Sequence, residues 1–457
     1  MSEVRQEDAH RRNRSIRLAV VTSLFSKLGT VILRLVSIPI AIRVLGMEEF
    51  GVYATITMAV ALIDTFHVGI GPALTQAISR AAATGDRERE RAVFVTAFLI
   101  SSGLTLLIAT VLACLLYFLP VGTLFGEKFL PYADPIHRAC TIAIIVISIQ
   151  LISMVSDKAR DGYLETRYNN AWGAGGNFLG AIVLASGIWF FPTIEFLVLA
   201  INGSAALGKL CNAVHLMRRR PYLIPSFSGF RRELVKPLVH DGALFTVGAL
   251  NALAEYNAAS YLIGRLTGPA AAGVFAVLVT LHMSLTGVIQ MLTIPAWPAL
   301  VDAKERGDVA WIQKMAHRLQ LIGPAFAVAV GIGLVTLGPW ALPLWAGKEF
   351  QLDRFGLLAF SVYFLVHIWR HVNHMLLYGL GKVAASAAVT AVEALVVLLT
   401  VAWASSQGAD VTRILWTMVV SLALVGSAIY PVLVRRSVRE IHEPGGVGIA
   451  PVGSVLV

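Results

Sequence analysis

Charged residues are scarce in this 457-residue chain, where Asp, Glu, Lys and Arg together make up only 14%. Soluble domains carry about 25% charged residues, so this chain has too few to cover a water-facing surface. Hydrophobic residues make up 57% of the chain, and its mean hydropathy is +0.73. These values place the chain in a lipid bilayer and exclude soluble enzymes, nucleic-acid-binding proteins and disordered scaffolds.

Cysteine is also scarce, and Cys114, Cys140 and Cys211 lie scattered in or beside apolar runs. No C-x-x-C pair occurs, so the sequence supports neither a disulfide framework nor a metal knuckle. The sequence also lacks P-loop, kinase and hydrolase motifs, so we expect no ATP site, no enzymatic activity and no cofactor. Ten-residue segments of alternating polarity are missing as well, which argues against a β-barrel.

Long apolar runs dominate the chain, each close to the ~20 residues that a spanning helix needs. Backbone groups in hydrocarbon must bond within the protein, so these runs predict an all-α integral membrane fold. The first run is too long for a signal-peptide core, and we expect it to stay in the protein. We predict twelve transmembrane helices, at residues 18–42, 50–77, 92–118, 138–157, 170–191, 194–216, 238–263, 271–299, 316–338, 355–378, 383–404 and 412–434.

The distribution of Lys and Arg supports this topology. With the N-terminus inside, 26 of these residues fall in inside segments and only 7 in outside loops. Cytoplasmic loops of membrane proteins carry such an excess, and an even number of helices returns the chain to the same side. We therefore predict a multi-pass protein with both termini in the cytoplasm, and the net charge of +10 mainly reflects topology.

An internal repeat divides the chain into two halves of six helices. The two copies are related by a constant offset of 222 residues, which also carries Gly85-Asp86 onto Gly307-Asp308. The longest match pairs Arg43-Val-Leu-Gly46 and Gly51-Val-Tyr-Ala54 with Arg265-Leu-Thr-Gly268 and Gly273-Val-Phe-Ala276. Six helices per copy make the repeats parallel, and two such lobes around a central cleft are an architecture of transporters.

The repeat and the polar stretch between the halves give the predicted domain organisation. Residues 1–17 form an N-terminal tail, 18–216 an N-lobe, 217–237 a cytoplasmic linker, 238–434 a C-lobe, and 435–457 a C-terminal tail.

Two segments resemble a known family. Residues 44–54, VLGMEEFGVYA, resemble the loop and second-helix start of polysaccharide-biosynthesis flippases of the Wzx-like, O-antigen type. Residues 64–88, DTFHVGIGPALTQAISRAAATGDRE, continue in the same register with a mid-helix Asp, a Gly-rich turn and a cytoplasmic loop. The two six-helix halves fit the wider multidrug/oligosaccharidyl-lipid/polysaccharide exporter superfamily. Its peptidoglycan-precursor flippases have two additional helices, for which this chain has no room.

The resemblance implies a function. Such proteins move polyprenyl-diphosphate-linked oligosaccharides across the bacterial inner membrane for surface polysaccharide synthesis. The partners it implies are this lipid-linked glycan, membrane lipids and other polysaccharide assembly proteins, but not nucleic acid. Alternating access through a cationic cleft is the expected mechanism, driven by a proton, a sodium ion or no ion.

Charges inside spanning helices are the candidate transport residues, because such charges face a cavity or a partner by default. Lys27 and Arg34 lie seven residues apart on one face of the first predicted helix. Cations of these two types suit phosphate, which makes them candidate substrate-binding residues. Lys27 could instead snorkel to the inner boundary, as we expect of Lys209 near another inner helix end.

A gate is a second possibility raised by the repeat. Glu255 maps through the offset of 222 to position 33, beside Arg34. We hypothesise that these two side chains form an outer salt bridge that opens when phosphate competes for Arg34. A static pair inside one lobe is the alternative.

Titratable residues elsewhere are candidates for ion coupling. Asp64 and His67 share a face of the second predicted helix, where the pair could exchange protons or form a structural hydrogen bond. His282 and Glu393 are isolated polar groups in the eighth and eleventh predicted helices, and are further candidates for gating or coupling.

The tenth predicted helix carries a basic and titratable stripe. Its members are spaced i, i+3, i+4 and i+7 on one helix face, namely His367, Arg370, His371 and His374. This stripe predicts an anion-facing wall of the cleft, although basic residues at a cytoplasmic helix end would equally satisfy the positive-inside rule. No carboxylate or Cys lies near in sequence, so we do not expect zinc.

Two other functions compete with the flippase. A cation-coupled multidrug exporter of the same superfamily would want acidic walls, and Asp64, Glu255 and Glu393 keep this alternative open. A membrane-embedded glycan polymerase or ligase usually has a large polar outer loop, whereas the longest outer loop here, residues 119–137, is short and plain.

Overall fold

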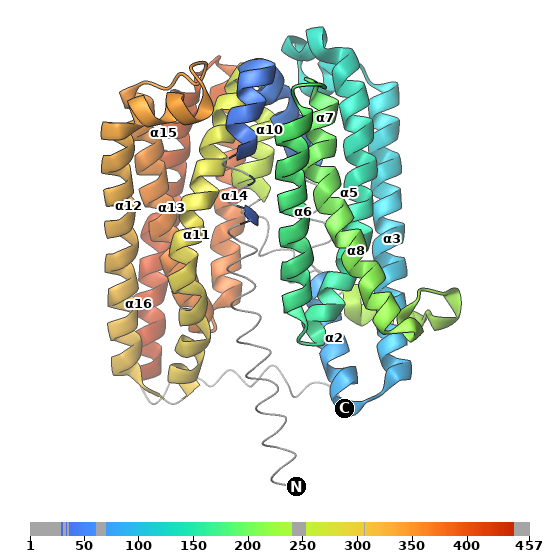
Figure 1. Cartoon of the computed structure of the whole chain (residues 1–457). Helices are drawn as coiled ribbons and strands as arrows, with labels where there is room; N and C mark the ends of the chain where they lie inside the picture. Colours follow the sequence, from blue (N-terminus) through green and yellow to red (C-terminus); the bar gives the residue numbers. More distant parts are fainter. Residues whose placement is uncertain are drawn as a thin grey trace. The chain divides into compact units, whose positions relative to one another are not determined.

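The computed structural model describes residues 29–30, 33, 36–60, 70–239, 253–305 and 307–442. Nearly all of these residues are helical, and none of them forms a strand (Figure 1). This confirms the predicted all-α membrane fold. The described residues divide into two compact units. Unit 1 takes its residues from Met1–Thr280, Trp340–Gln351 and Val401–Val411, and unit 2 from Leu281–Pro339, Leu352–Thr400 and Thr412–Val457.

Eight helical stretches within the described residues are long and apolar enough to cross a membrane. They are Arg87–Phe118, Glu127–Gly162, Ile194–Arg219, Pro269–Thr293, Val309–Ala346, Arg354–Gly379, Val383–Ser406 and Val411–Ile441. Three of the twelve predicted spans, 18–42, 50–77 and 238–263, contain residues outside the described set, so the count of twelve stays a prediction. The span expected at 170–191 is helical, but its Asn and Gly residues make it less apolar than these eight.

Unit 1 begins with the helical residues 29–30, 33 and 36–60. Its further helices are α2 (Ile70–Thr84), α3 (Arg87–Phe118), α4 (Val121–Phe125), α5 (Ala133–Gly162), α6 (Thr166–Gly187), α7 (Ile194–Val198), α8 (Ser204–Arg219) and α10 (Ala259–Thr267). Short 3-10 turns occur at Glu127–Tyr132 and, in the linker, at Pro221–Leu223, Phe227–Gly229 and Arg232–Leu234. π turns occur at Leu199–Gly203 and Leu253–Ala258.

The core of unit 1 lies among α2, α3, α5 and α8, whose buried side chains include Ile78, Phe94 and Leu216. Figure 1 shows α3, α5 and α8 side by side, with α6 packed on α8. The linker joins this core through the buried Leu223, and Arg91 of α3 donates hydrogen bonds to the Ser226 and Ser228 hydroxyls. The linker is therefore folded onto the end of unit 1.

The helix α11 (Pro269–Glu305) starts in unit 1 and continues in unit 2. Unit 2 also contains all of α13 (Arg354–Gly379) and α16 (Ala428–His442), and most of α12 (Val309–Ala346), α14 (Val383–Ser406) and α15 (Val411–Leu422). A π turn at Ala423–Ser427 joins α15 to α16. The core of unit 2 includes Leu300, Ile312, Phe364 and Tyr430, which come from α11, α12, α13 and α16.

The starts of α3 and α12 are set by capping residues and not by hydropathy, so these two helices extend beyond the apolar runs. Gly85 has a φ of +69° and ends α2, after which the Asp86 carboxylate accepts from the Arg89 backbone N–H at 2.9 Å and caps α3. The repeat-related turn has the same geometry. Gly307 has a φ of +67°, and the Asp308 carboxylate accepts from the Trp311 backbone N–H at 3.0 Å. The repeated Gly-Asp pair thus encodes a helix stop followed by a helix start.

The repeat also explains two further glycines, Gly51 and Gly273. A Cβ on Gly51 would overlap the Pro269 carbonyl oxygen and lie 2.9 Å from the Gly273 nitrogen. A Cβ on Gly273 would lie 2.7 Å from the Met47 carbonyl oxygen and 3.4 Å from the Gly51 Cα. The two repeat-related glycines therefore meet at a backbone contact within unit 1, where neither tolerates a side chain.

We predict that Gly51→Ala destabilises the protein by about 3 kcal/mol, because backbone atoms must move to admit the methyl group. Gly103→Ala is the matched control, since a Cβ there meets nothing within 4 Å. Thermal unfolding of the purified protein in detergent measures both. Equal midpoints for the two variants would contradict the close contact.

Candidate functional site

A bidentate ion pair lies in the interior of unit 2, between α13 and α14. The Arg370 Nε and Nη2 atoms each donate a hydrogen bond of 2.7 Å to the Glu393 carboxylate, one to each oxygen. The Arg370 side chain is 5% exposed and that of Glu393 is 0% exposed. Neither charge can reach solvent, so each depends on the other for its stability in this position.

A third helix completes the surroundings of this pair. The Tyr430 hydroxyl of α16 donates to Glu393 Oε2 at 3.1 Å and shares a hydrogen bond of 2.9 Å with the Thr390 hydroxyl. A Cβ on Gly426, in the π turn before α16, would overlap Glu393 Oε1. The absence of a side chain at Gly426 therefore leaves room for the carboxylate.

The histidines of α13 face two different neighbours. His371 and His367 contact α11. His371 Nε2 shares a hydrogen bond of 3.0 Å with the hydroxyl of Thr293, and the centroid of the His367 ring lies 4.3 Å from that of the His282 ring. His374 Nδ1 instead shares a hydrogen bond of 2.8 Å with the Ser386 hydroxyl on α14. The predicted stripe is thus divided between contacts with α11 and contacts with α14.

Six of the predicted site residues therefore belong to one polar region of unit 2. They are His282, His367, Arg370, His371, His374 and Glu393. Their functional roles stay predictions. Among the described residues, no three His, Cys, Asp or Glu side chains form a group that could hold a metal ion.

The remaining predicted site residues are Glu255 and four residues of the first two predicted helices. Glu255 is 1% exposed in the π turn Leu253–Ala258 of unit 1. Lys27, Arg34, Asp64 and His67 lie outside the described residues. The proposed outer gate between Arg34 and Glu255, and the proton exchange between Asp64 and His67, stay predictions.

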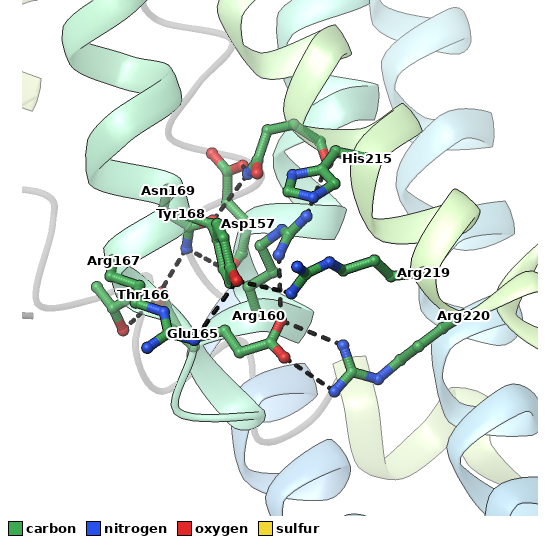
Figure 2. Close-up of polar contacts among 12 residues, drawn as sticks. Asp157, Arg160, Glu165, Thr166, Arg167, Tyr168, Asn169, His215, Arg219 and Arg220 are labelled. Carbon is green, nitrogen blue, oxygen red and sulfur yellow. Dashed lines mark hydrogen bonds and ion pairs between the residues drawn. The ribbon is translucent and has the colours of Figure 1, made fainter. Parts of the chain in front are cut away.

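Unit 1 contains a second polar cluster that was not predicted from the sequence (Figure 2). Asp157 of α5 accepts from Lys209 at 2.8 Å and from Asn212 at 2.6 Å, both on α8. Lys209 thus forms an ion pair and does not snorkel freely. Asn169 of α6 donates to the Asp157 carbonyl at 2.7 Å, which ties the third helix to the same point.

Glu165 joins two arginines next to this cluster. It accepts from the fully buried Arg160 at 3.1 Å and from the two Nη atoms of Arg220 at 3.0 and 3.1 Å. The Arg220 guanidinium also lies 3.9 Å from the centroid of the Tyr163 ring. This places the start of the linker against the loop between α5 and α6.

A buried acid, Glu90, holds the linker on its other side. The Tyr163 and Tyr222 hydroxyls donate to Glu90 Oε2 at 2.7 and 2.6 Å. Burial, followed by the hydrogen bond to Glu90, raises the pKa of Tyr222, and the same two causes raise the pKa of Tyr163. Both phenols therefore stay protonated and act as donors.

We predict that Glu393→Gln costs about 3–5 kcal/mol of unfolding free energy, because it leaves the Arg370 guanidinium buried without its counter-charge. The double variant Arg370→Met/Glu393→Leu should recover most of that loss, since apolar side chains replace both charges. Glu440→Gln, which removes a carboxylate from an exposed ion pair with Lys382, is the control and should leave the midpoint unchanged. Thermal unfolding in detergent gives all three values, and an unaffected Glu393→Gln protein would contradict the buried pair.

Comparison with solved structures shows the fold. An inward-facing multidrug resistance MATE family transporter of the MOP superfamily is 13% identical, with a TM-score of 0.75, over 92% of this chain and 99% of that one. An outward-facing form of such a transporter is 14% identical, with a TM-score of 0.60, over 94% and 97%. A MOP superfamily transporter from Pyrococcus furiosus, described as having a binding pocket of reverse polarity that suggests a different function, is 14% identical, with a TM-score of 0.59, over 94% and 97%.

Comparison of the sequence shows the family. No curated protein matches the chain significantly. Residues 19–304 match the family described as "Polysaccharide biosynthesis protein", which covers more than half of the chain. The three solved structures of similar fold are described as transporters. With the helical membrane spans, these matches show that the chain is a multi-pass membrane protein of the polysaccharide biosynthesis protein family, with a MATE-like transporter fold.

Proposed function

We propose that this protein is a flippase, which moves a polyprenyl-diphosphate-linked oligosaccharide from the cytoplasmic to the outer leaflet of a bacterial inner membrane. The family match over residues 19–304 carries this proposal, because it joins polysaccharide synthesis to a chain with a transporter fold. Membrane lipids and other polysaccharide assembly proteins are the further partners.

An anionic cargo fits the charges of the chain. The first predicted helix contains Lys27 and Arg34 and no acidic residue. The similar Pyrococcus furiosus transporter is described as having a pocket of reverse polarity, which indicates that this fold accepts binding regions of different charge. A diphosphate needs cations along its path, and arginine offers it two parallel hydrogen bonds.

The Arg370–Glu393 pair is the proposed point of ion coupling. In the paired state Glu393 neutralises the Arg370 guanidinium and also accepts a hydrogen bond from Tyr430. The His374 ring contacts the Tyr430 ring. A proton or sodium ion bound to the carboxylate would release the Arg370 donors, which could then bind a phosphate oxygen. Alternating access would follow when Arg370 exchanges Glu393 for the phosphate of the cargo.

We expect cells depleted of this protein to accumulate a polyprenyl-diphosphate-linked oligosaccharide while surface polysaccharide falls, because the glycan is made inside and cannot cross. Extraction of lipids from depleted cells, followed by mass spectrometry, measures the pool and identifies the glycan. An unchanged pool together with a new sensitivity to cationic drugs would refute the flippase and favour a multidrug exporter.

We predict that the double variant Arg370→Met/Glu393→Leu folds but fails to restore surface polysaccharide in depleted cells, because its stability is recovered without the exchangeable charges. Protein level and thermal midpoint establish folding, and Glu440→Gln serves as the active control. Full restoration by the double variant would show that the pair only stabilises unit 2.

A further inference from the structure

Three guanidinium groups surround a single aromatic ring in unit 1, at the start of α6 and the end of α8 (Figure 2). The Cζ atoms of Arg160, Arg167 and Arg219 lie 4.8, 4.9 and 4.9 Å from the centroid of the Tyr168 ring. The His215 ring meets the same ring edge-on, with centroids 5.2 Å apart. We call these five residues the Tyr168 cluster.

The cluster has more cations than acids to neutralise them. Glu165 is the nearby carboxylate, and it is bonded to Arg160 and Arg220. No carboxylate of the described residues lies within 4.0 Å of Arg167 or Arg219. Both donate to the Tyr168 hydroxyl, at 3.4 and 2.6 Å, which leaves most of their N–H donors for a ligand.

The burial of these arginines shows which of them a ligand can reach. Arg160 is fully buried and fixes the inner face of the ring, where its Nη2 also donates to the Asn212 carbonyl at 3.3 Å. Arg219 is exposed and Arg167 is half-buried. The two outer guanidinium groups are therefore preorganised on a ring that a buried cation holds in place, a geometry that suits a phosphate.

Apolar surface continues from the cluster along both helices. On α8, Leu207, Leu210 and Val214 are exposed at i, i+3 and i+7, and the stripe ends in the arginines at the C-terminus of the helix. On α6, the positions one and two turns after Arg167 are the exposed Ala171 and Gly175, and a Cβ on Gly175 would meet nothing within 4 Å. Small residues below a cation leave room for an acyl chain.

The position of the cluster along the membrane normal fits a lipid headgroup. It lies beside the linker, at the end of unit 1 that the Lys and Arg distribution predicts to be cytoplasmic. Basic pockets between transmembrane helices on that side bind the headgroups of anionic phospholipids. A free phosphate would gain nothing from the exposed apolar stripes, whereas a phospholipid would use both.

We propose that Arg167 and Arg219, held on the Tyr168 ring, bind the phosphate of an anionic phospholipid whose acyl chains lie along α6 and α8. This site does not depend on the identity of the transported cargo. It holds a resident lipid at the boundary of unit 1 and thereby ties the linker end of α8 to the membrane.

The test is titration of the delipidated full chain with phosphatidylglycerol, with bound lipid counted by native mass spectrometry. We expect Arg167→Gln/Arg219→Gln to weaken binding by about tenfold for each arginine removed, because each loses charge-assisted hydrogen bonds to phosphate. Arg218→Gln is the matched control for Arg219→Gln alone, since each removes one charge from an exposed position and Arg218 lies outside the Tyr168 cluster. It should stay within about twofold of the wild type, because a single exposed charge contributes little.

Further arms separate the alternatives. Tyr168→Phe keeps the ring and should retain binding, whereas Tyr168→Leu removes the ring and should lose binding. Arg219→Gln alone provides a milder variant if the double variant fails to fold. Phosphatidylcholine should not bind to this site. Equal losses in Arg218→Gln and the double variant, or equal binding of phosphatidylcholine, would overturn the proposal.

Inorganic pyrophosphate distinguishes the source of the phosphate. We expect it not to displace phosphatidylglycerol at equal concentration, because it has no acyl chains for α6 and α8. Displacement at equal concentration would show that the cluster recognises a bare diphosphate, such as that of a lipid-linked glycan, and would refute the phospholipid assignment.

Discussion

Polar groups inside a bilayer must find their partners within the protein, because no water is present to replace a missing one. In unit 2 this constraint is met by the pairing of Arg370 with Glu393, at 2.7 Å through both oxygens. A single charge at a helix centre costs about 2.5–3.5 kcal/mol on insertion scales, so neither residue is tolerable alone. Tyr430 and Gly426 bring α16 to the same point, one by a hydrogen bond and the other by leaving space. This contact constrains the rotation of α13, α14 and α16 about their own axes.

The same constraint acts on the backbone where helices end. The repeated Gly-Asp pair turns the chain through a positive φ and then caps the next helix, at residues 85–86 and again at 307–308. Gly51 and Gly273 are related by the same offset and meet each other, so the repeat records a packing contact as well as a turn. Duplication thus preserved those positions at which a side chain is excluded or a cap is required.

Much of the fold could be predicted from the sequence, since hydropathy and the repeat depend on local composition. The membrane spans, the stripe on α13 and the polar character of His282 and Glu393 are all of this kind. The pairings could not be predicted, because Arg370 and Glu393 are 23 residues apart and Asp157 and Lys209 are 52 apart, on separate helices. Their contact depends on how each helix is rotated. The stripe on α13 is a related case, because positions i to i+7 cover an arc wide enough to face both α11 and α14.

The two arginine sites differ in when their charge is available to an anion. Arg370 is neutralised by Glu393, so it can bind a phosphate only after the carboxylate has taken up another partner. Arg167 and Arg219 lie on the face of an aromatic ring, whose quadrupole stabilises a cation without neutralising it, so they can bind an anion at all times. A conditional cation suits a step in a transport cycle, whereas a permanent one suits a resident ligand. The distinction rests on the neighbour of each guanidinium, a carboxylate in unit 2 and a tyrosine ring in unit 1.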